Sequence, residues 1–148
     1  MDSIDIVILW VDGADPEWQR ERARYHGLSD TDNSAIRFRD WDLLRFWFRG
    51  VECFAPWVHR VHFVTCGHLP GWLDTSNPKL HVVRHSDYIP ADALPTFNSN
   101  AIELGLNRIE GLSERFIYFN DDMFLLRPMH PTDFFVDGLP CDDAILSP

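Results

Sequence analysis

The three residues Asn120, Asp121 and Asp122 carry the strongest chemical signal in this sequence. They directly follow the apolar run 116–119, which is typical of a short buried strand. In an open α/β sheet, ligands bind in the crevice outside the carboxyl ends of the strands. Paired carboxylates there suit a hard cation such as Mg²⁺ or Mn²⁺, which prefers oxygen ligands and also contacts substrate phosphates. Residues 120–122 are therefore candidate metal ligands, and a merely solvated acidic loop is the alternative.

A further carboxylate stands at the end of another expected strand. Residues 4–11 are almost uninterrupted apolar sequence, broken only by Asp5, as in a strand buried on both faces of a parallel sheet. The run ends at residues 12–16, where Gly and Pro enforce a turn. If both strands are parallel in one sheet, Asp12 converges with the acids at 121–122. The alternative is an Asx-turn, in which the Asp12 side chain bonds its own backbone.

The composition is that of a globular domain with an acidic balance. The chain has 148 residues, enough for one domain with a substantial core, and 45% of them are hydrophobic. The formal net charge of -10 argues against nucleic acid as a partner, because nucleic-acid surfaces are basic. The 3 cysteines are scattered and odd in number, which predicts free thiols in a reducing compartment.

No apolar stretch of about 18 residues is visible, and the N-terminus does not resemble a signal peptide. We therefore expect no transmembrane segment and a cytoplasmic location, with peripheral attachment at the inner membrane left open. The oligomeric state is also left open by the sequence.

Strand-like and helix-like segments alternate along the rest of the chain. The further expected segments are strands at 58–65 and 80–83 and helices at 40–54 and 99–109. Repeated strand–helix–strand order predicts an α/β fold, with a mostly parallel sheet and helices on its faces. The sequence after Pro128 is rich in turns and offers no helix to cover the last face of the sheet. Residues 1–148 are therefore expected to form a single domain that is minimal or truncated at its C-terminus.

Further candidate ligands flank the expected helices. Arg37 and Arg39 precede the helix at 40–54, and a guanidinium matches phosphate oxygens in a bidentate manner. The alternative is a solvated helix start in which these arginines pair with nearby acids. Asn98 and Ser99 begin the helix at 99–109, where backbone N–H groups favour an anion. Asn98 also suits a plain helix cap.

An aromatic residue and two histidines complete the candidates that the residue types suggest. Trp10, at the end of the first strand, could stack on a base or fill the core. His68 and His85 follow expected strands and are the better acid/base candidates among the 7 histidines.

Taken in order, several segments resemble the Stealth family of sugar-phosphate transferases. Ile4 to Pro16 (IDIVILWVDGADP) resembles the first signature block of that family. The segments that resemble its second block are RFRD at 37–40, FAPW at 54–57, VTCG at 64–67, LPTFNS at 94–99 and FIYFNDD at 116–122. The resemblance covers nearly the whole chain, and several matches in one order are more specific than a lone acidic pair.

The resemblance implies a Rossmann-like core similar to those of nucleotide-sugar transferases. It implies an enzyme that moves a hexose 1-phosphate, such as N-acetylglucosamine 1-phosphate, from a nucleotide sugar to an acceptor hydroxyl. The implied setting is capsule or exopolysaccharide biosynthesis, with a nucleotide-sugar donor and a glycan acceptor as partners. Mg²⁺ is implied at residues 120–122.

The resemblance also implies roles for individual residues. The implied catalytic residues are Asp121, Asp122 and Arg39, and the implied metal ligands are Asn120, Asp121 and Asp122. The implied donor-binding residues are Trp10, Asp12, Gly13, Arg37, Thr65, Asn98 and Ser99. Cys66 and Asn100 stand where the family pattern has Asn and His, and two further family blocks, with a histidine and an arginine region, do not occur before Pro148.

Two other functions stay open at this point. A metal-dependent glycosyltransferase that moves the sugar alone would use the same acidic motif and would release a nucleoside diphosphate. A non-catalytic domain that binds a nucleotide sugar would bind the donor without turnover.

Overall fold

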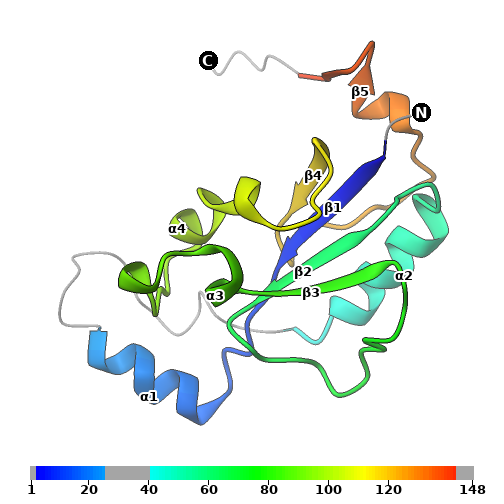
Figure 1. The fold of residues 1–148 in the computed structure, drawn as a ribbon. Helices are drawn as coiled ribbons and strands as arrows, with labels where there is room; N and C mark the ends of the chain where they lie inside the picture. Colours follow the sequence, from blue (N-terminus) through cyan, green and yellow to red (C-terminus); the bar gives the residue numbers. More distant parts are fainter. Residues whose placement is uncertain (1–2, 26–40, 143–148) are drawn as a thin grey trace, which may run out of the picture.

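The computed structural model describes residues 3–25 and 41–142 of the chain and shows a four-stranded sheet with the order β3-β2-β1-β4 (Figure 1). The strands are β1 (Ile4–Leu9), β2 (Val61–Thr65), β3 (Leu80–Arg84) and β4 (Arg115–Phe119). All three pairings between neighbouring strands are parallel. The expected α/β fold with a parallel sheet is confirmed, and its strand order is the 3-2-1-4 half of a Rossmann-like fold.

Helices cover both faces of this sheet (Figure 1). The α-helices are α1 (Pro16–Tyr25), α2 (Leu44–Phe54), α3 (His85–Tyr88) and α4 (Ser99–Glu103). The 3-10 helices are η3 (Ala91–Ala93), η4 (Leu106–Arg108) and η5 (Pro131–Asp133). Helix α2 packs on one face and α3, α4 and η4 on the other, while α1 lies beyond the carboxyl edge. A small antiparallel hairpin of β5 (Phe135–Val136) and β6 (Leu139–Pro140) follows, near the start of β1.

Side chains alternate between two hydrophobic clusters along β1. Ile6 and Ile8 pack on one face with Trp47 and Val51 of α2. Val7 packs on the opposite face, in the cluster that contains residues of α3, α4 and η4. Because both faces of the strand are covered, its residues are almost all apolar, as the sequence pattern predicted.

The start of α2 differs from the expected one. The helix expected at 40–54 begins at Leu44, because Asp42 has a φ of 54° and this left-handed conformation cannot belong to a right-handed helix. The helix ends at Phe54, just before Pro56, as predicted.

The helix expected at 99–109 is split into α4 and η4. The break falls at Gly105, where an added Cβ would lie 3.0 Å from the ring of Tyr88. Gly is a poor helix former, and its lack of a side chain lets the Tyr88 ring pack against the backbone. The strand expected at 58–65 is also shorter and begins at Val61.

A buried carboxylate connects several segments at the amino-terminal end of the sheet. Asp5 is fully buried and accepts a hydrogen bond from the backbone N–H of Ser113 at 2.8 Å. Its two oxygens also lie 2.8 Å from Nδ1 of His59 and 3.1 Å from Nε2 of His62. Nδ1 of His62 lies 3.0 Å from Nδ1 of His81. Because His62 donates through Nε2 to Asp5, its Nδ1 accepts the proton of His81.

We expect the free energy of unfolding to fall as the pH drops from about 6.5 to about 4. Burial lowers the pKa of His85 from 6.5 to about 4, and burial also lowers the pKa of His62. Between these pH values the unfolded chain binds a proton that the folded chain does not, so acid favours unfolding. For His85 alone the loss approaches about 3 kcal/mol at the acid end. Urea unfolding at a series of pH values measures it.

The variant His85→Gln tests the assignment of this pH dependence. It should flatten the stability profile between pH 6.5 and pH 4, because the titrating group is gone. His130→Gln, a change at an exposed position, is the matched control and should leave the profile as it is. An unchanged slope in His85→Gln would show that another group titrates in this range.

Candidate functional site

The candidate site lies at the carboxyl edge of the sheet, where β1 and β4 are neighbours. Ile8 of β1 is in register with Phe119 of β4, and the two strands are parallel. The sheet is extended from β1 in opposite directions by β2 and by β4, so the strand order reverses between β1 and β4. Ligands of open α/β sheets bind at such a switch point. Because β1 and β4 are parallel neighbours, the segments that follow them leave the sheet at the same edge.

Residues 120–122 are exposed at the end of β4, and Tyr118 of that strand contacts the Asn120 side chain. The Tyr118 hydroxyl lies 3.0 Å from Oε1 of Glu103 in α4 and 2.7 Å from the side-chain amide of Asn120. Burial and the neighbouring Glu103 raise the pKa of Tyr118, so the hydroxyl keeps its single proton. The hydroxyl can donate this proton to Oδ1 of Asn120 or to Oε1 of Glu103, the two acceptors within hydrogen-bond distance.

The oxygen atoms of residues 120–122 fit a hard cation by their chemistry. Within residues 3–25 and 41–142, no three His, Cys, Asp or Glu side chains form a group that could hold a metal ion. The described structure therefore does not assemble Asp12, Asp121 and Asp122 into one three-carboxylate cluster. Mg²⁺ does not need such a cluster, since it is often bound by one or two carboxylates together with substrate phosphates and water.

Asp12 forms the Asx-turn that was the alternative interpretation of its position. Its Oδ1 accepts a hydrogen bond from the backbone N–H of Ala14 at 2.9 Å. Its own backbone N–H donates to Nδ1 of His68 at 3.2 Å, which ties the end of β1 to the loop after β2. The turn occupies one oxygen of the carboxylate, so the turn and a ligand contact are compatible roles.

A cavity of about 380 Å³ opens between the end of β1, the start of α2 and the loop after β2. Its lining residues are Trp10, Asp12, Asp15, Asp42, Leu44, His68, Leu69, Pro70, Gly71 and Trp72. Two of the sequence candidates, Trp10 and Asp12, thus meet in one cavity. Trp10 also stacks on Phe63 with ring centroids 5.7 Å apart, so it serves the core as well as the cavity wall.

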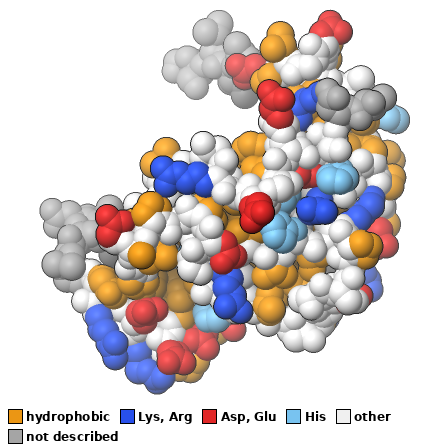
Figure 2. Space-filling model, viewed as in Figure 1, with side chains coloured by type: hydrophobic (Ala, Val, Ile, Leu, Met, Phe, Trp, Pro, Cys, Tyr) orange, Lys and Arg blue, Asp and Glu red, His pale blue; other side chains and the backbone are white. Residues whose placement is uncertain are grey.

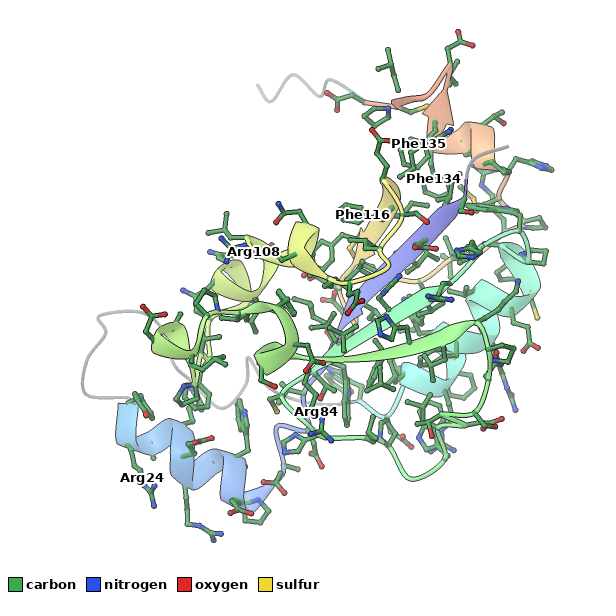
Figure 3. The ribbon with its side chains drawn as sticks, in the orientation of Figure 1. Arg24, Arg84, Arg108, Phe116, Phe134 and Phe135 are labelled. Atoms are coloured by element: carbon green, nitrogen blue, oxygen red, sulfur yellow. The ribbon has the colours of Figure 1, made fainter. Side chains whose placement is uncertain are left out.

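The charge near this edge is mixed. Figure 2 shows acidic and basic side chains side by side over α1, which leads away from the end of β1. Arg84 ends β3 on the same edge of the sheet and is exposed, as Figure 3 shows. At the mouth of the cavity, Arg45 pairs with Asp42 at 2.9 Å and lies 5.9 Å from the ring centroid of Trp72.

Other sequence candidates lie beside the cavity or outside the described residues. Thr65 is fully buried and donates its hydroxyl hydrogen to the carbonyl oxygen of His68 at 2.9 Å. Its place is below the loop that carries His68, and it does not line the cavity. The Gly13 carbonyl accepts a hydrogen bond from the Gln19 side chain at 2.8 Å. Arg37 and Arg39 lie outside the described residues.

Asn98 caps α4, which was the alternative to anion binding at this position. Its Oδ1 accepts the backbone N–H of Asn100 at 3.0 Å, and Ser99 is the first helical residue. Because α4 has only 5 residues, its helix dipole contributes little to the binding of an anion. The preceding Phe97 instead packs against Trp18 and Tyr25 of α1, with ring centroids 5.6 Å and 5.8 Å apart. The binding of the donor by Asn98 stays a prediction.

Sequence reasoning missed most of the cavity wall. Asp15, Asp42 and Trp72 were not candidates, and His68 was only a general acid/base suggestion. The available signal was the segment 68–72 (HLPGW) directly after a buried strand, a polar and aromatic loop at a carboxyl end.

The fold and the place of the site define a Rossmann-like α/β protein whose candidate site lies at the switch point of a parallel sheet. Residues 2–30 match the family model described as Stealth protein CR1, conserved region 1. Residues 37–141 match the model described as Stealth protein CR2, conserved region 2. The chain belongs to the Stealth family, as the sequence resemblance predicted.

Individual relatives match over nearly the whole chain. The receptor polysaccharide phosphotransferase WefC of Streptococcus oralis is 51% identical over 153 residues, covering 100% of this chain and 46% of the relative. The exopolysaccharide phosphotransferase cps2G of Lactiplantibacillus plantarum is 53% identical over 143 residues, covering 96% of this chain and 42% of the relative. The capsular polysaccharide phosphotransferase WcwK of Streptococcus pneumoniae is 49% identical over 153 residues, covering 100% and 46%.

This chain spans about half the length of these curated relatives. Among the described residues, no helix is both long and apolar enough to cross a membrane.

Proposed function

We propose that this chain forms the donor-binding core of a sugar-phosphate transferase in capsule or exopolysaccharide biosynthesis. The enzyme would move a hexose 1-phosphate, such as N-acetylglucosamine 1-phosphate, from a nucleotide sugar to a hydroxyl of a glycan acceptor. The observation that carries the proposal is the identity of about half of all residues, over the whole chain, with proteins named polysaccharide phosphotransferases. The position of the acidic segment at the switch point of the sheet supports it.

The proposed reaction forms one oxygen–phosphorus bond and breaks another. The acceptor hydroxyl attacks the phosphorus that carries the sugar, and the nucleoside monophosphate leaves with the electron pair of the broken bond. The carboxylate of Asp121 or Asp122 would take the proton of the attacking hydroxyl, and both are exposed at the strand end. Arg37 and Arg39 are proposed to contact the phosphoryl oxygens, since guanidinium groups match them.

We propose that Mg²⁺, or Mn²⁺ in its place, is held by Asn120, Asp121 and Asp122. A bound divalent cation would neutralise charge on the phosphates of the donor. The contribution of the chain itself is to present these oxygen atoms at a fixed place. Tyr118 and Glu103 support that placement, because the hydrogen bond of 2.7 Å from Tyr118 restrains the Asn120 side chain.

Binding and product analysis together test this proposal. We expect UDP-N-acetylglucosamine to bind in a Mg²⁺-dependent manner in a calorimetric titration, and UMP to appear when an acceptor is present. Release of UDP in place of UMP would identify a metal-dependent glycosyltransferase. Binding without any released nucleotide would identify a non-catalytic donor-binding domain. A titration with EDTA in place of Mg²⁺ is the control for the metal requirement.

We also propose a cytoplasmic location, with peripheral association at the inner membrane. The support is the cysteine chemistry: Cys53, Cys66 and Cys141 are free and exposed thiols, which a reducing compartment preserves.

A further inference from the structure

The cavity between β1, α2 and the loop after β2 has a composition that identifies the part of the donor it can take. Its volume of about 380 Å³ is at the small end of the usual range for ligand pockets, roughly 300–1,000 Å³. That volume suits one ring of a nucleotide sugar rather than the whole molecule. This inference rests on the proposed function, because it takes a nucleotide sugar as the ligand.

The charged side chains that line the cavity do not favour phosphate. The described lining residues include the carboxylates of Asp12, Asp15 and Asp42 and contain no Lys or Arg; Asp42 is paired with Arg45 at 2.9 Å, so Asp12 and Asp15 carry the negative charge of the wall. Carboxylates repel phosphate oxygens and accept hydrogen bonds from hydroxyl groups. A ligand part with hydroxyl groups and without charge is therefore the better match for this wall.

His68 adds a hydrogen-bond donor that faces one of these acceptors. Its Nδ1 accepts the backbone N–H of Asp12 at 3.2 Å, so the neutral imidazole carries its proton on Nε2. That Nε2 lies 3.8 Å from Oδ1 of Asp15, which is too far for a good hydrogen bond. A hydroxyl oxygen between the two side chains could accept from Nε2 and donate to the carboxylate, and so satisfy both.

Two indole rings supply the apolar part of the wall. Trp10 is held by its stacking on Phe63, and Trp72 packs edge-on against Phe48 with ring centroids 6.0 Å apart. Trp72 is 41% exposed, so much of its surface is available to a ligand. The C–H face of a sugar ring packs well on such a surface, while its hydroxyl groups reach the polar side chains.

We propose that this cavity binds an uncharged, hydroxyl-bearing ring of the donor, either the ribose or the transferred sugar. One ring hydroxyl bridges Nε2 of His68 and the carboxylate of Asp15. The phosphates of the donor lie outside the cavity.

The variant Asp15→Asn tests the acceptor without removing a structural contact. Asp15 caps α1 by accepting the backbone N–H of Trp18 at 2.7 Å, and Asn is an equally good cap. Because Oδ1 stays with the Trp18 N–H, the amide replaces Oδ2 with a donor and removes the negative charge that strengthens a hydrogen bond from a ring hydroxyl. We expect the variant to bind UDP-N-acetylglucosamine about tenfold or more weakly in calorimetric titrations. Its affinity for inorganic pyrophosphate should equal that of the unaltered protein.

Two further nucleotides distinguish the two possible rings. If the ribose occupies the cavity, Asp15→Asn weakens UDP as well, and 2′,3′-dideoxy-UDP binds both proteins equally. If the transferred sugar occupies it, UDP binds both proteins equally and only UDP-N-acetylglucosamine is weakened. Asp74→Asn is the matched control, because Asp74 caps a turn through Ser76 at 3.0 Å and does not line the cavity.

A second variant tests the donor. The amide oxygen of Asn can replace Nδ1 of a histidine, so His68→Asn can keep the contact with the Asp12 backbone while it loses the Nε2 donor. We expect a loss for the same ligand as in Asp15→Asn. The double variant should lose less binding free energy than the sum of the two single losses, since one hydroxyl serves both groups.

Equal affinity of both single variants and the unaltered protein for UDP-N-acetylglucosamine would overturn the cavity assignment alone. An equal loss for inorganic pyrophosphate would overturn it too, because the phosphates would then be the cavity ligand. If the unaltered protein binds neither UDP nor UDP-N-acetylglucosamine, the proposed function fails together with this inference.

Discussion

The substitution Asp122→Asn should reduce the proposed sugar-phosphate transfer by a factor of about a hundred or more while leaving the fold intact. The amide cannot accept the proton of the attacking hydroxyl, and it is a weaker ligand for Mg²⁺ than a carboxylate. Asp122 is exposed at the end of β4, so its loss removes no buried contact of the sheet. The measurement is the rate of UMP release at saturating donor, together with urea unfolding of the same variant.

An exposed acid elsewhere gives the control for this substitution. Asp137→Asn changes the charge equally in the turn of the β5-β6 hairpin and should leave the rate as it is. Full activity in Asp122→Asn would remove this residue from the chemistry and leave Asp121 as the candidate base. A lower rate with an equally lowered stability would instead point to a structural role.

The agreement between sequence and structure is best where local pattern decides the outcome. The apolar runs before Asp12 and Asn120 predict two strands, and the structure places them side by side as β1, which is buried, and the edge strand β4, which is mostly half-buried. From that pairing alone, the shared rim of the two acidic segments follows. The stop of α2 before Pro56 likewise depends on the chemistry of one residue.

The sequence-based expectations fail where contacts between distant segments determine the local structure. The break after α4 depends on Tyr88 packing against Gly105, and nothing within the sequence 99–109 reveals that neighbour. The start of α2 depends on the left-handed conformation of Asp42, which propensity does not predict. The cavity was not predicted for the same reason. Its wall combines Trp10 with Trp72, which lies far along the chain in a loop without regular structure.

Asp5 shows the same limit most clearly. In the sequence it is only an exception within the apolar run 4–11, and one residue of this kind says nothing about its partners. The structure shows that residues from two other segments, His59, His62 and Ser113, converge on its carboxylate. The convergence requires β1 and β2 to be paired and the turn before β4 to lie beside them.

We expect Asp5→Ala to lower the free energy of unfolding by about 3–5 kcal/mol, the usual cost of removing one partner from a buried charged network. The backbone N–H of Ser113 and Nε2 of the fully buried His62 would each lose an acceptor. Burial alone would raise the pKa of Asp5, but its hydrogen bonds outweigh burial and lower it. Its contribution is therefore present above pH 3.8 and is lost as the pH falls through the lowered pKa.

Urea unfolding at pH 7 measures this loss, and two further variants show its origin. Asp5→Asn keeps one acceptor oxygen for Ser113 or His62 and should cost less than Asp5→Ala, because fewer buried donors stay unsatisfied. Asp92→Ala, at an exposed position of η3, should change the stability by no more than about 0.5 kcal/mol. A loss of less than about 1 kcal/mol in Asp5→Ala would mean that water replaces the carboxylate at these donors. The network would then be a consequence of the strand pairing and not a condition for it.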